Sequence, residues 1–480
     1  MRRRASLMVN LKSYSLPVLL VLLAGCTVGP DFSRPETTAL PQSFTNISGP
    51  NVASRDEAAD YQFWRQFNDP QLTELVEQAL SQNYDLRTAL ANFDAANALL
   101  RAAKFDQIPT VTMSADAGHQ RLSSDEANGT SRSNDVYSHK ASLSWELDFF
   151  GRVRRSLESK RSEVEAKASD LKAIQVVVVS NVATTYIDLR AAQRMLELSK
   201  ANAVSQRQTL DIVKGRLDAG RGSTYELSRA QAQLDTTLAR IPQFEVKIAI
   251  DKHRLAVLTG MSPASYDSLL PGEAAMPSVP ETIKADTPAN VIRRRPDVAS
   301  AEHTLHAATA QIGVTTADLF PRVTLGAAIG TYAFNGSSLY SNSAESNLTL
   351  LGIDWSFLDA GRVKSRIEAA DAEAAGRLAN YQQTVLMALE DVENAIVGFS
   401  RIKDEDARLT SAAVELKRAS DLAGDKYRAG AIELSERLDV QRELYSAQIE
   451  QTSSHARNAA AAVNLFISIA GGWSWNVKKS

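Results

Sequence analysis

The chain has 480 residues, of which 53 are basic and 56 acidic, so its formal net charge is −3 at pH 7. This balance gives no basic surface of the kind that nucleic-acid-binding proteins carry. Cys26 is the only cysteine, which excludes disulfide bonds and cysteine clusters within one chain. Beyond the N-terminus no apolar run approaches the roughly 18 residues of a membrane-spanning helix. We therefore expect any membrane crossing to be made by strands.

The N-terminus has the features of a bacterial secretory signal. Residues 2–4 are arginines, residues 16–23 are apolar, and Leu23-Ala24-Gly25-Cys26 forms a small-residue cleavage site. This tetrapeptide resembles a bacterial lipobox, in which the cysteine is acylated and becomes the first residue of the mature protein. An ordinary secretory peptide with a chance cysteine is the alternative. Thr27 stands in place of the aspartate associated with inner-membrane retention, so the resemblance implies the outer membrane.

One stretch of the sequence, residues 142–155, occurs twice. Trp145 and Gly151 recur 210 positions later as Trp355 and Gly361. The match continues without a gap, through the pairs Arg152 and Arg362, Val153 and Val363, Gly220 and Gly430, Gln231 and Gln441, and Leu234 and Leu444. An internal repeat of this length fixes the architecture before any local pattern does, and it predicts one body built from two similar halves.

Each half begins with helices and continues with strands. Leu72, Leu75, Val76 and Ala79 have helical spacing, and alanine-rich helices are predicted over residues 85–105 and from Asp297. Pro109 and Pro321 end these helices. Strict alternation of apolar and polar residues then predicts four strands, over residues 110–117, 141–149, 323–329 and 351–357. Polar stretches at residues 120–135 and 334–346 read as exposed hairpin loops.

The alternating strands are compatible with two structures. They have the length and the two-faced pattern of transmembrane barrel strands, but a half-buried sheet of a soluble domain shows the same alternation. The lipobox and the repeat favour the barrel. Four strands cannot close a barrel in lipid, because an open edge leaves backbone groups unpaired. Three chains would supply about 12 strands, a sensible pore size.

Two very long helical hairpins follow the strands. The first runs from Gly151 to about Arg216, roughly 65 residues, which corresponds to about 100 Å of helix. Apolar residues at intervals of seven favour a coiled coil, and the chain returns to about Leu258 with a kink expected at Pro242. The second hairpin is predicted over residues 361–427 and 434–470. Long helical hairpins joined to a pore would form a tunnel.

These patterns divide the chain into six parts. The expected divisions are a lipoprotein signal peptide (1–25), an acylated arm (26–70), the first repeat (71–260), a linker (261–290), the second repeat (291–472) and a tail (473–480).

The whole chain resembles the outer-membrane factor family of tripartite export systems, the TolC-like channels, and within it the NodT-like or OprM-like lipoproteins. The resemblance rests on four motifs: Cys26-Thr27-Val28-Gly29-Pro30-Asp31-Phe32, Arg294-Arg295-Pro296-Asp297-Val298, the junctions at Gly151-Arg152 and Gly361-Arg362, and Gly471-Gly472-Trp473. It implies a mostly α-helical trimer with transmembrane β-strands, in which a barrel of about 12 strands continues into a periplasmic helical barrel. The channel would sit passively in the outer membrane, tethered by lipid on Cys26.

The resemblance also implies partners and a gate. The partners are a periplasmic adaptor and an inner-membrane pump, with the resistance-nodulation-division type preferred. Tyr427, Glu226, Glu436 and Asp439 match gate positions of the family, and carboxylates that project inward from three chains would favour cations. Ile432 stands where the family has a locking arginine, so Arg437 or Arg428 is expected to replace it. Asp218 and Arg428 are repeat-equivalent and opposite in charge, and could pair across the tip.

No residue cluster suggests an enzyme. His303 and His306 lack the cysteine or carboxylate partners of a metal site and read as a surface pair, and residues 293–295 read as a solvated helix start. No cofactor is expected beyond the covalent lipid. Two rivals remain open, namely a channel for metal ions or polypeptide in place of drugs and small organic molecules, and a non-conducting coiled-coil spacer lipoprotein.

Overall fold

The computed structural model describes residues 27–35, 41–45, 52–54, 62–127, 131–264 and 275–469. Cys26, the signal peptide and the tail lie outside the described residues, as do parts of the predicted arm and linker. The chain divides into two compact units, the first formed by Met1–Pro35, Asn92–Ala168 and Ser300–Gln382 and the second by Glu36–Ala91, Ser169–Ala299 and Gln383–Ser480. No helix within the described ranges is long and apolar enough to cross a bilayer.

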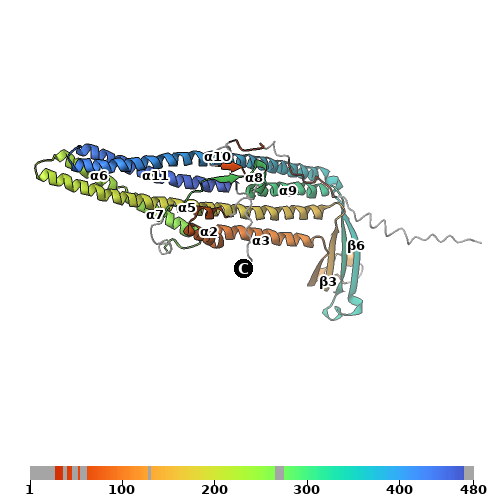
Figure 1. Cartoon of the computed structure of the whole chain (residues 1–480). Coiled ribbons are helices and arrows are strands. Elements are labelled where there is room, and N and C mark those ends of the chain that lie inside the picture. The colour runs from red at the N-terminus through yellow and green to blue at the C-terminus, as the bar shows by residue number, and fades with distance from the viewer. Residues whose placement is uncertain are drawn as a thin grey trace, which may run out of the picture. The chain divides into compact units, whose positions relative to one another are not determined.

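A four-stranded antiparallel sheet dominates the first unit (Figure 1). Its strands in order are β2 (Thr110–Arg121), β3 (Ser133–Leu147), β5 (Arg322–Ala333) and β6 (Glu345–Asp354). The central pair joins the two repeats, with Leu143 opposite Ala327. The four predicted strands are confirmed, with different ends. All four extend further toward the hairpin loops than the alternation indicated, and β3 and β6 end before the predicted Phe149 and Phe357. Short helices, α4 (Ser124–Ala127), η3 (Gly336–Ser338) and η4 (Asn342–Ala344), occupy what remains of the loops.

The repeated tryptophans have the same structural role in both halves. The indole N–H of Trp145 donates to the carbonyl of Gln107 at 3.1 Å, and that of Trp355 donates to the carbonyl of Leu319 at 3.0 Å. In both cases the acceptor lies just after the helix that precedes the strand pair, α3 (Tyr84–Phe105) or α9 (Pro296–Ala317). The bond therefore fastens the end of each hairpin to the helix before it. A further short helix, η5 (Phe357–Asp359), follows β6.

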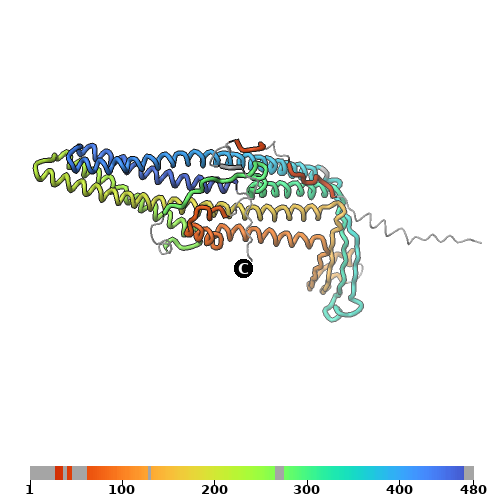
Figure 2. The backbone as a smooth tube through the Cα atoms, viewed as in Figure 1, coloured from red at the N-terminus to blue at the C-terminus, as the bar shows by residue number. Residues whose placement is uncertain are grey.

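The predicted helical hairpins are confirmed (Figure 2). The outgoing helices are α5 (Arg152–Asp218) and α10 (Ala360–Arg428), and α11 (Leu434–Ile469) returns in one piece. The first return is divided into α6 (Thr224–Leu238) and α7 (Ile241–Leu258). The predicted kink at Pro242 is therefore a complete break between two helices. Proline is tolerated in the first turn of a helix, where its missing N–H would have no partner, but it disrupts the interior of a helix.

Aromatic residues form the centre of the second unit. Phe63, Trp64 and Phe67 lie on η1 (Phe63–Phe67) and are buried, and Phe63 stacks on Phe466 of α11 at 5.2 Å between ring centres. Helix α2 (Pro70–Gln82) follows, capped by Asp69, whose side chain accepts hydrogen bonds from two backbone N–H groups. The four apolar residues that predicted this helix are all buried.

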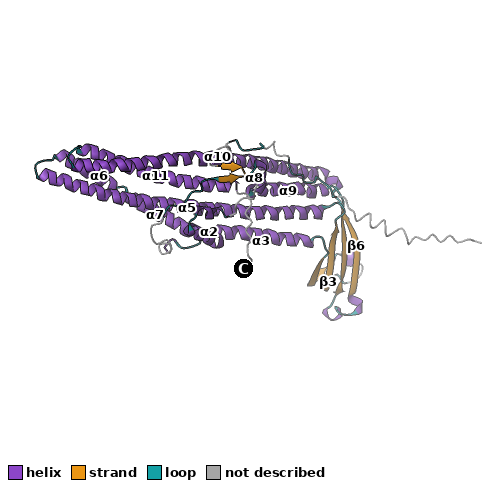
Figure 3. Cartoon of the chain, in the orientation of Figure 1, coloured by secondary structure: helices purple, strands orange, loops and turns teal. Residues whose placement is uncertain are grey.

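The structure adds elements that the sequence did not indicate. Strand β1 (Val52–Ser54) pairs in parallel with β4 (Ile283–Ala285), shown in orange among the helices in Figure 3. Helix α8 (Pro288–Arg294) follows.

The interpretation of residues 293–295 as a solvated helix start is wrong for two of the three. Arg294 pairs with Asp286, and Arg295, whose side chain is 12% exposed, pairs with Asp297 and Asp391.

Candidate functional site

The two hairpin turns of the second unit, which end α5 and α10, have the same backbone. Gly220 and Gly430 have φ angles of +67° and +71°. The amide of Arg221 donates to the carbonyl of Arg216, and the amide of Ala431 donates to that of Lys426, both at 2.8 Å. A left-handed glycine followed by such a bond is the common way to end a helix. We call the region formed by these turns and the adjoining helix ends the helical tip.

Tyr427 lies in the middle of the helical tip. Its side chain is 4% exposed. It packs in a cluster drawn from α5, α6, α10 and α11, whose other buried members are Ala203, Leu210, Val213, Ala230, Leu234, Leu434 and Leu438. The residue that matched a gate tyrosine therefore holds the hairpins of both repeats together.

Two arginines flank Tyr427. The Arg216 guanidinium donates to the tyrosine hydroxyl at 3.1 Å and lies 5.5 Å from the ring centre. The Arg437 guanidinium lies 5.2 Å from the same ring and donates to the Thr209 hydroxyl at 3.1 Å. Cations within about 6 Å of an aromatic ring are attracted to its face. Burial lowers the pKa of Arg437, whereas the hydrogen bond to Tyr427 raises that of Arg216.

Of the two arginines expected to replace the one missing at Ile432, only Arg437 contacts Tyr427. Ile432 itself packs against the apolar cluster. Arg428 is exposed and pairs with Asp425 on its own helix. Asp218 is also exposed, and no ion pair in the described part of a single chain joins it to Arg428. The structure thus brings Tyr427 and Arg437 together and leaves Asp218 and Arg428 apart.

The three predicted gate carboxylates differ in their surroundings. Glu226 forms a capping box with Ser223 at the start of α6, accepting from the serine amide at 3.0 Å. Asp439 has two arginine partners, with Arg229 at 3.5 Å and Arg442 at 3.3 Å. Glu436 is exposed in the first turn of α11, and none of the ion pairs between described residues includes it. Of these three carboxylates, only Glu436 has neither a hydrogen bond nor an ion pair with a described residue.

Arg216 and Arg229 are site residues that sequence reasoning missed. Arg229 and Asp439 are 210 positions apart, so they occupy the same place in the two repeats and pair with each other. The alignment of the two repeats could have predicted this ion pair, because it places an arginine and an aspartate at equivalent positions. No comparable signal pointed to Arg216, since its partner depends on how the two hairpins pack.

The predicted lipidation site lies outside the described residues, but the chain that follows it is firmly held in the first unit. The amide of Val28 donates to the carbonyl of Phe150 at 3.2 Å, and the buried Arg155 donates to Asp31 at 2.6 Å. Gly29 has φ of +86°, and a Cβ there would lie 2.4 Å from the Cα of Gly313. The motif after Cys26 therefore fits the junction between strand and helix closely.

Nothing in the described residues joins three or more potential metal-ligating His, Cys, Asp or Glu side chains. The interpretation of His303 and His306 as a surface pair is wrong for His306, which is half-buried. Its ring stacks on Phe32 at 4.3 Å between centres, and its Nε2 lies 2.9 Å from a Glu158 oxygen. His306 therefore helps to hold the segment that follows Cys26.

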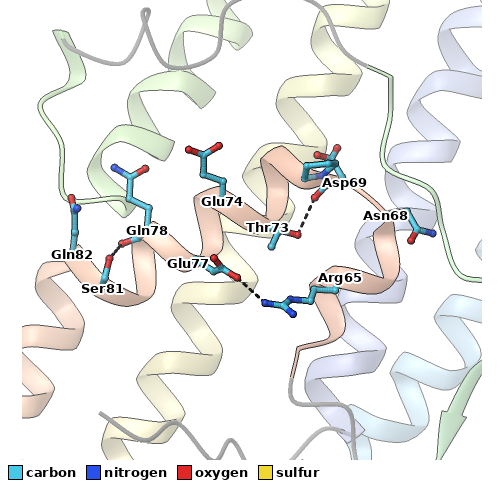
Figure 4. A pocket seen from close by; sticks show the side chains of 10 residues that line it. Arg65, Asn68, Asp69, Thr73, Glu74, Glu77, Gln78, Ser81 and Gln82 are labelled. Carbon is cyan, nitrogen blue, oxygen red and sulfur yellow. Dashed lines mark hydrogen bonds and ion pairs between the residues drawn. The ribbon is translucent and has the colours of Figure 1, made fainter. Parts of the chain in front are cut away.

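A pocket of about 870 Å³ lies along α2 in the second unit (Figure 4). It is lined by polar side chains of η1 and α2, among them Glu74, Gln78 and Gln82. Arg65 and Glu77 pair at 3.0 Å at its edge, with more than half of each side chain exposed. Exposed pairs contribute about 0–1 kcal/mol, and among the described residues that line the pocket none is a buried charged group from another element. Its chemistry does not mark it as the site.

Known proteins share both the sequence pattern and the fold of this chain. The profile of the outer membrane efflux protein family matches residues 75–261 and 287–471. The chain belongs to this family. Nodulation protein T of Rhizobium leguminosarum bv. trifolii is 31% identical over 473 residues, covering 96% of this chain and 97% of that protein. The toluene efflux pump outer membrane protein TtgC of Pseudomonas putida is 29% identical, covering 96% and 95%.

Solved structures of outer-membrane channels have the same fold. The outer-membrane channel OprN is 34% identical, with a TM-score of 0.85, and the similarity covers 93% of this chain and all of that one. The CmeC channel of Campylobacter jejuni, 20% identical, has the same fold with a TM-score of 0.86. The two matched segments correspond to the two repeats. The predicted family, fold class, export-channel function and outer-membrane location are confirmed.

Proposed function

We propose that three copies of this chain form the exit channel of a tripartite efflux system. Substrate would pass passively from an inner-membrane pump and a periplasmic adaptor to the exterior, and the helical tip would be the gate. Family membership supports the export role, and one relative is named as the outer membrane protein of a toluene efflux pump. The resemblance favours a pump of the resistance-nodulation-division type.

The sheet supports assembly from several chains. Within one chain β2 and β6 are edge strands, each paired on one side only. An edge strand in lipid would leave its outer N–H and C=O groups without hydrogen bonds, at several kcal/mol per group. Pairing of β6 of one copy with β2 of the next removes both edges, and three copies give about 12 strands.

The proposal that the helical tip is the gate rests on one observation, the burial of Tyr427 between Arg216 and Arg437. The three side chains come from the ends of α10 and α5 and the start of α11, so they tie the two hairpins of one chain together. Separating the hairpins would expose the ring and break the two contacts that join one hairpin to the other, Arg216 with Tyr427 and Arg437 with Thr209. In this proposal Arg437 and Arg216 replace the lock that other family members make with an arginine at the position of Ile432.

Glu436 would set the charge preference of the narrow end. In a trimer three such carboxylates would face one another in a small space, which favours cations and repels anions. Asp439 would contribute less, because Arg229 and Arg442 offset its charge.

Acyl chains on Cys26 would tether the channel to the membrane, each buried methylene adding about 0.8 kcal/mol.

The first experiment measures assembly and gating of the purified, acylated protein. We expect a detergent-corrected mass of about three chains by light scattering, in accordance with the closure argument. In planar bilayers, Arg437→Ala is expected to increase the open fraction about tenfold, since it removes a contact worth roughly 1.4 kcal/mol. Arg428→Ala is the matched control and is expected to gate like the unchanged protein.

A stable monomer would refute the proposal that this chain forms a closed pore. A trimer in which Arg428→Ala opens the channel and Arg437→Ala does not would retain the exit channel and disprove the assigned lock. These two results are independent, because mass reports the closure of the sheet and conductance reports the helical tip.

A further inference from the structure

The helical part of the second unit contains two separate apolar clusters. The larger one surrounds Phe466 and reaches Ala191 on α5 and Ala456 on α11. The smaller one surrounds Tyr427 at the helical tip and reaches Ala203 on α5 and Leu438 on α11. On each helix a stretch of more than one turn lies between the two clusters.

Hydrogen bonds between side chains link the helices in and beside this interval. Ser199 bonds to Tyr445 across α5 and α11, at 2.9 Å between hydroxyl oxygens. The other links are Asn202 to Thr237, Gln441 to Ser205, Gln451 to Thr410, and both His455 and Asn458 to Asp406. We call these residues, together with Gln206, the polar layer.

Several oxygen atoms of the polar layer are buried without a hydrogen-bond donor. They are Gln206 Oε1, Gln441 Oε1, Asp406 Oδ1 and Asn458 Oδ1, none of which has a partner among the described residues. Each of the four residues is at most 8% exposed. A buried acceptor without a partner destabilises the packed arrangement, and water can satisfy it when the helices separate.

The fold does not require polar residues here. The first-repeat equivalents of Asp406 and Asn458, 210 positions earlier, are Leu196 and Ile248. The same helical positions therefore accept apolar side chains in one half and carry buried polar ones in the other.

The one break between the helices of the first return also lies at this level. Helix α6 ends at Leu238 and α7 begins at Ile241. Thr237, one residue before that end, belongs to the polar layer. The Arg240 guanidinium, within the break, lies 5.5 Å from the ring centre of Tyr445, whose hydroxyl bonds to Ser199.

We propose that the polar layer is the hinge about which the helical tip moves when the channel opens. Apolar clusters hold their packing, because separating them exposes apolar surface to water. Side-chain hydrogen bonds can exchange with water at little net cost. Bending is therefore confined to the polar layer, where the helix break already interrupts α6 and α7. This inference rests on the proposed function, since it assumes a gate at the tip.

The test extends the apolar cluster of the helical tip into the polar layer. Gln206→Leu combined with Gln441→Leu keeps side-chain volume and replaces two unpartnered amide oxygens by apolar groups. Both changes are made in a Tyr427→Ala background, whose gate is expected to be open for a measurable fraction of the time in planar bilayers. We expect the double change to lower the open fraction about tenfold, equivalent to about 1.4 kcal/mol. Gln208→Leu, an exposed residue on the same helix, is the matched control.

A second variant, expected to raise the open fraction, distinguishes an effect on gating from a failure to fold. Tyr445→Phe removes only the hydroxyl that bonds to Ser199. The Ser199 hydroxyl already donates to the carbonyl of Met195, so its oxygen becomes a buried acceptor without a donor, and the open fraction is expected to rise severalfold in the same background. Equal open fractions for the double variant and the Gln208→Leu control, or no rise with Tyr445→Phe, would refute the hinge. If Tyr427→Ala itself conducts no more than the unchanged protein, the gate proposal fails, so the two failures are distinguishable.

Discussion

The two turns of the helical tip have the same backbone and different side-chain chemistry. Gly220 and Gly430 end their helices with the same pair of hydrogen bonds. Around that backbone the first repeat has Leu217 and Leu227, where the second has Tyr427 and Arg437. The first turn is therefore apolar at the two positions where the second carries an aromatic hydroxyl and a cation.

Equivalent carboxylates are also used differently. Glu226 and Glu436 occupy the same position in the two repeats. Ser223 precedes Glu226 at the distance that a capping box requires, and the carboxylate caps α6. Glu433 stands in place of that serine before α11, and Glu436 remains exposed. Repetition preserved the shape of the turn, while the change from serine to glutamate left the second glutamate without a capping role.

The comparison predicts that the second turn holds the gate. Tyr427→Ala should destabilise the closed tip by about 3–5 kcal/mol, as for other large aromatic residues removed from a core. Leu217→Ala, at the equivalent and half-buried position, should cost about 1 kcal/mol. Conductance in planar bilayers would measure the difference as a much larger open fraction for Tyr427→Ala. Equal effects at the two positions would mean that both turns contribute alike to closure.

Much of this fold could be predicted because its signals are local and repeated. Strict alternation located the four strands, and the absence of glycine and proline over residues 152–214 predicted α5. The three-residue strands β1 and β4 were missed because so short a segment shows no alternation. Pairing in parallel, they also join segments more than 200 residues apart, which no local pattern indicates.

The site was less predictable, because its residues meet through packing. Tyr427 could be recognised by a motif, but its contacts with Arg216 and Arg437 depend on how the hairpins face one another. Glu226 is a different case. Ser223 and the spacing of three residues are a local signal that predicts its capping box, so this structural role of Glu226 was open to sequence reasoning.

A second experiment compares the two glutamates through charge selectivity. Glu436→Gln should lower the ratio of cation to anion permeability about fivefold, equivalent to roughly 1 kcal/mol, because the carboxylate removed has no cation beside it to offset its charge. Glu226→Gln should leave the ratio nearly unchanged, since glutamine also serves in a capping box. Reversal potentials in a potassium chloride gradient measure both. A larger effect at Glu226 would show that the pore is lined by the first turn.

The smallest expected effect comes from exchanging the caps themselves. Glu433→Ser would place a serine three residues before Glu436, so the second turn would gain the capping box of the first. We expect α11 to be stabilised by about 1 kcal/mol. The cation preference should fall by less than with Glu436→Gln, since the exposed carboxylate of Glu433 is removed while that of Glu436 remains and turns toward the backbone. The reciprocal change, Ser223→Glu, should destabilise α6 by a similar amount.

Thermal unfolding midpoints and reversal potentials of the two variants would be compared with those of the unchanged channel. Opposite shifts in the midpoint, together with a fall in selectivity for Glu433→Ser only, would mean that a single residue before each helix decides whether its glutamate caps the backbone or faces the pore. If Glu433→Ser stabilises the helix without changing selectivity, then Glu436 does not reach the conducting path, and the charge preference must arise from Asp439 or from outside the tip.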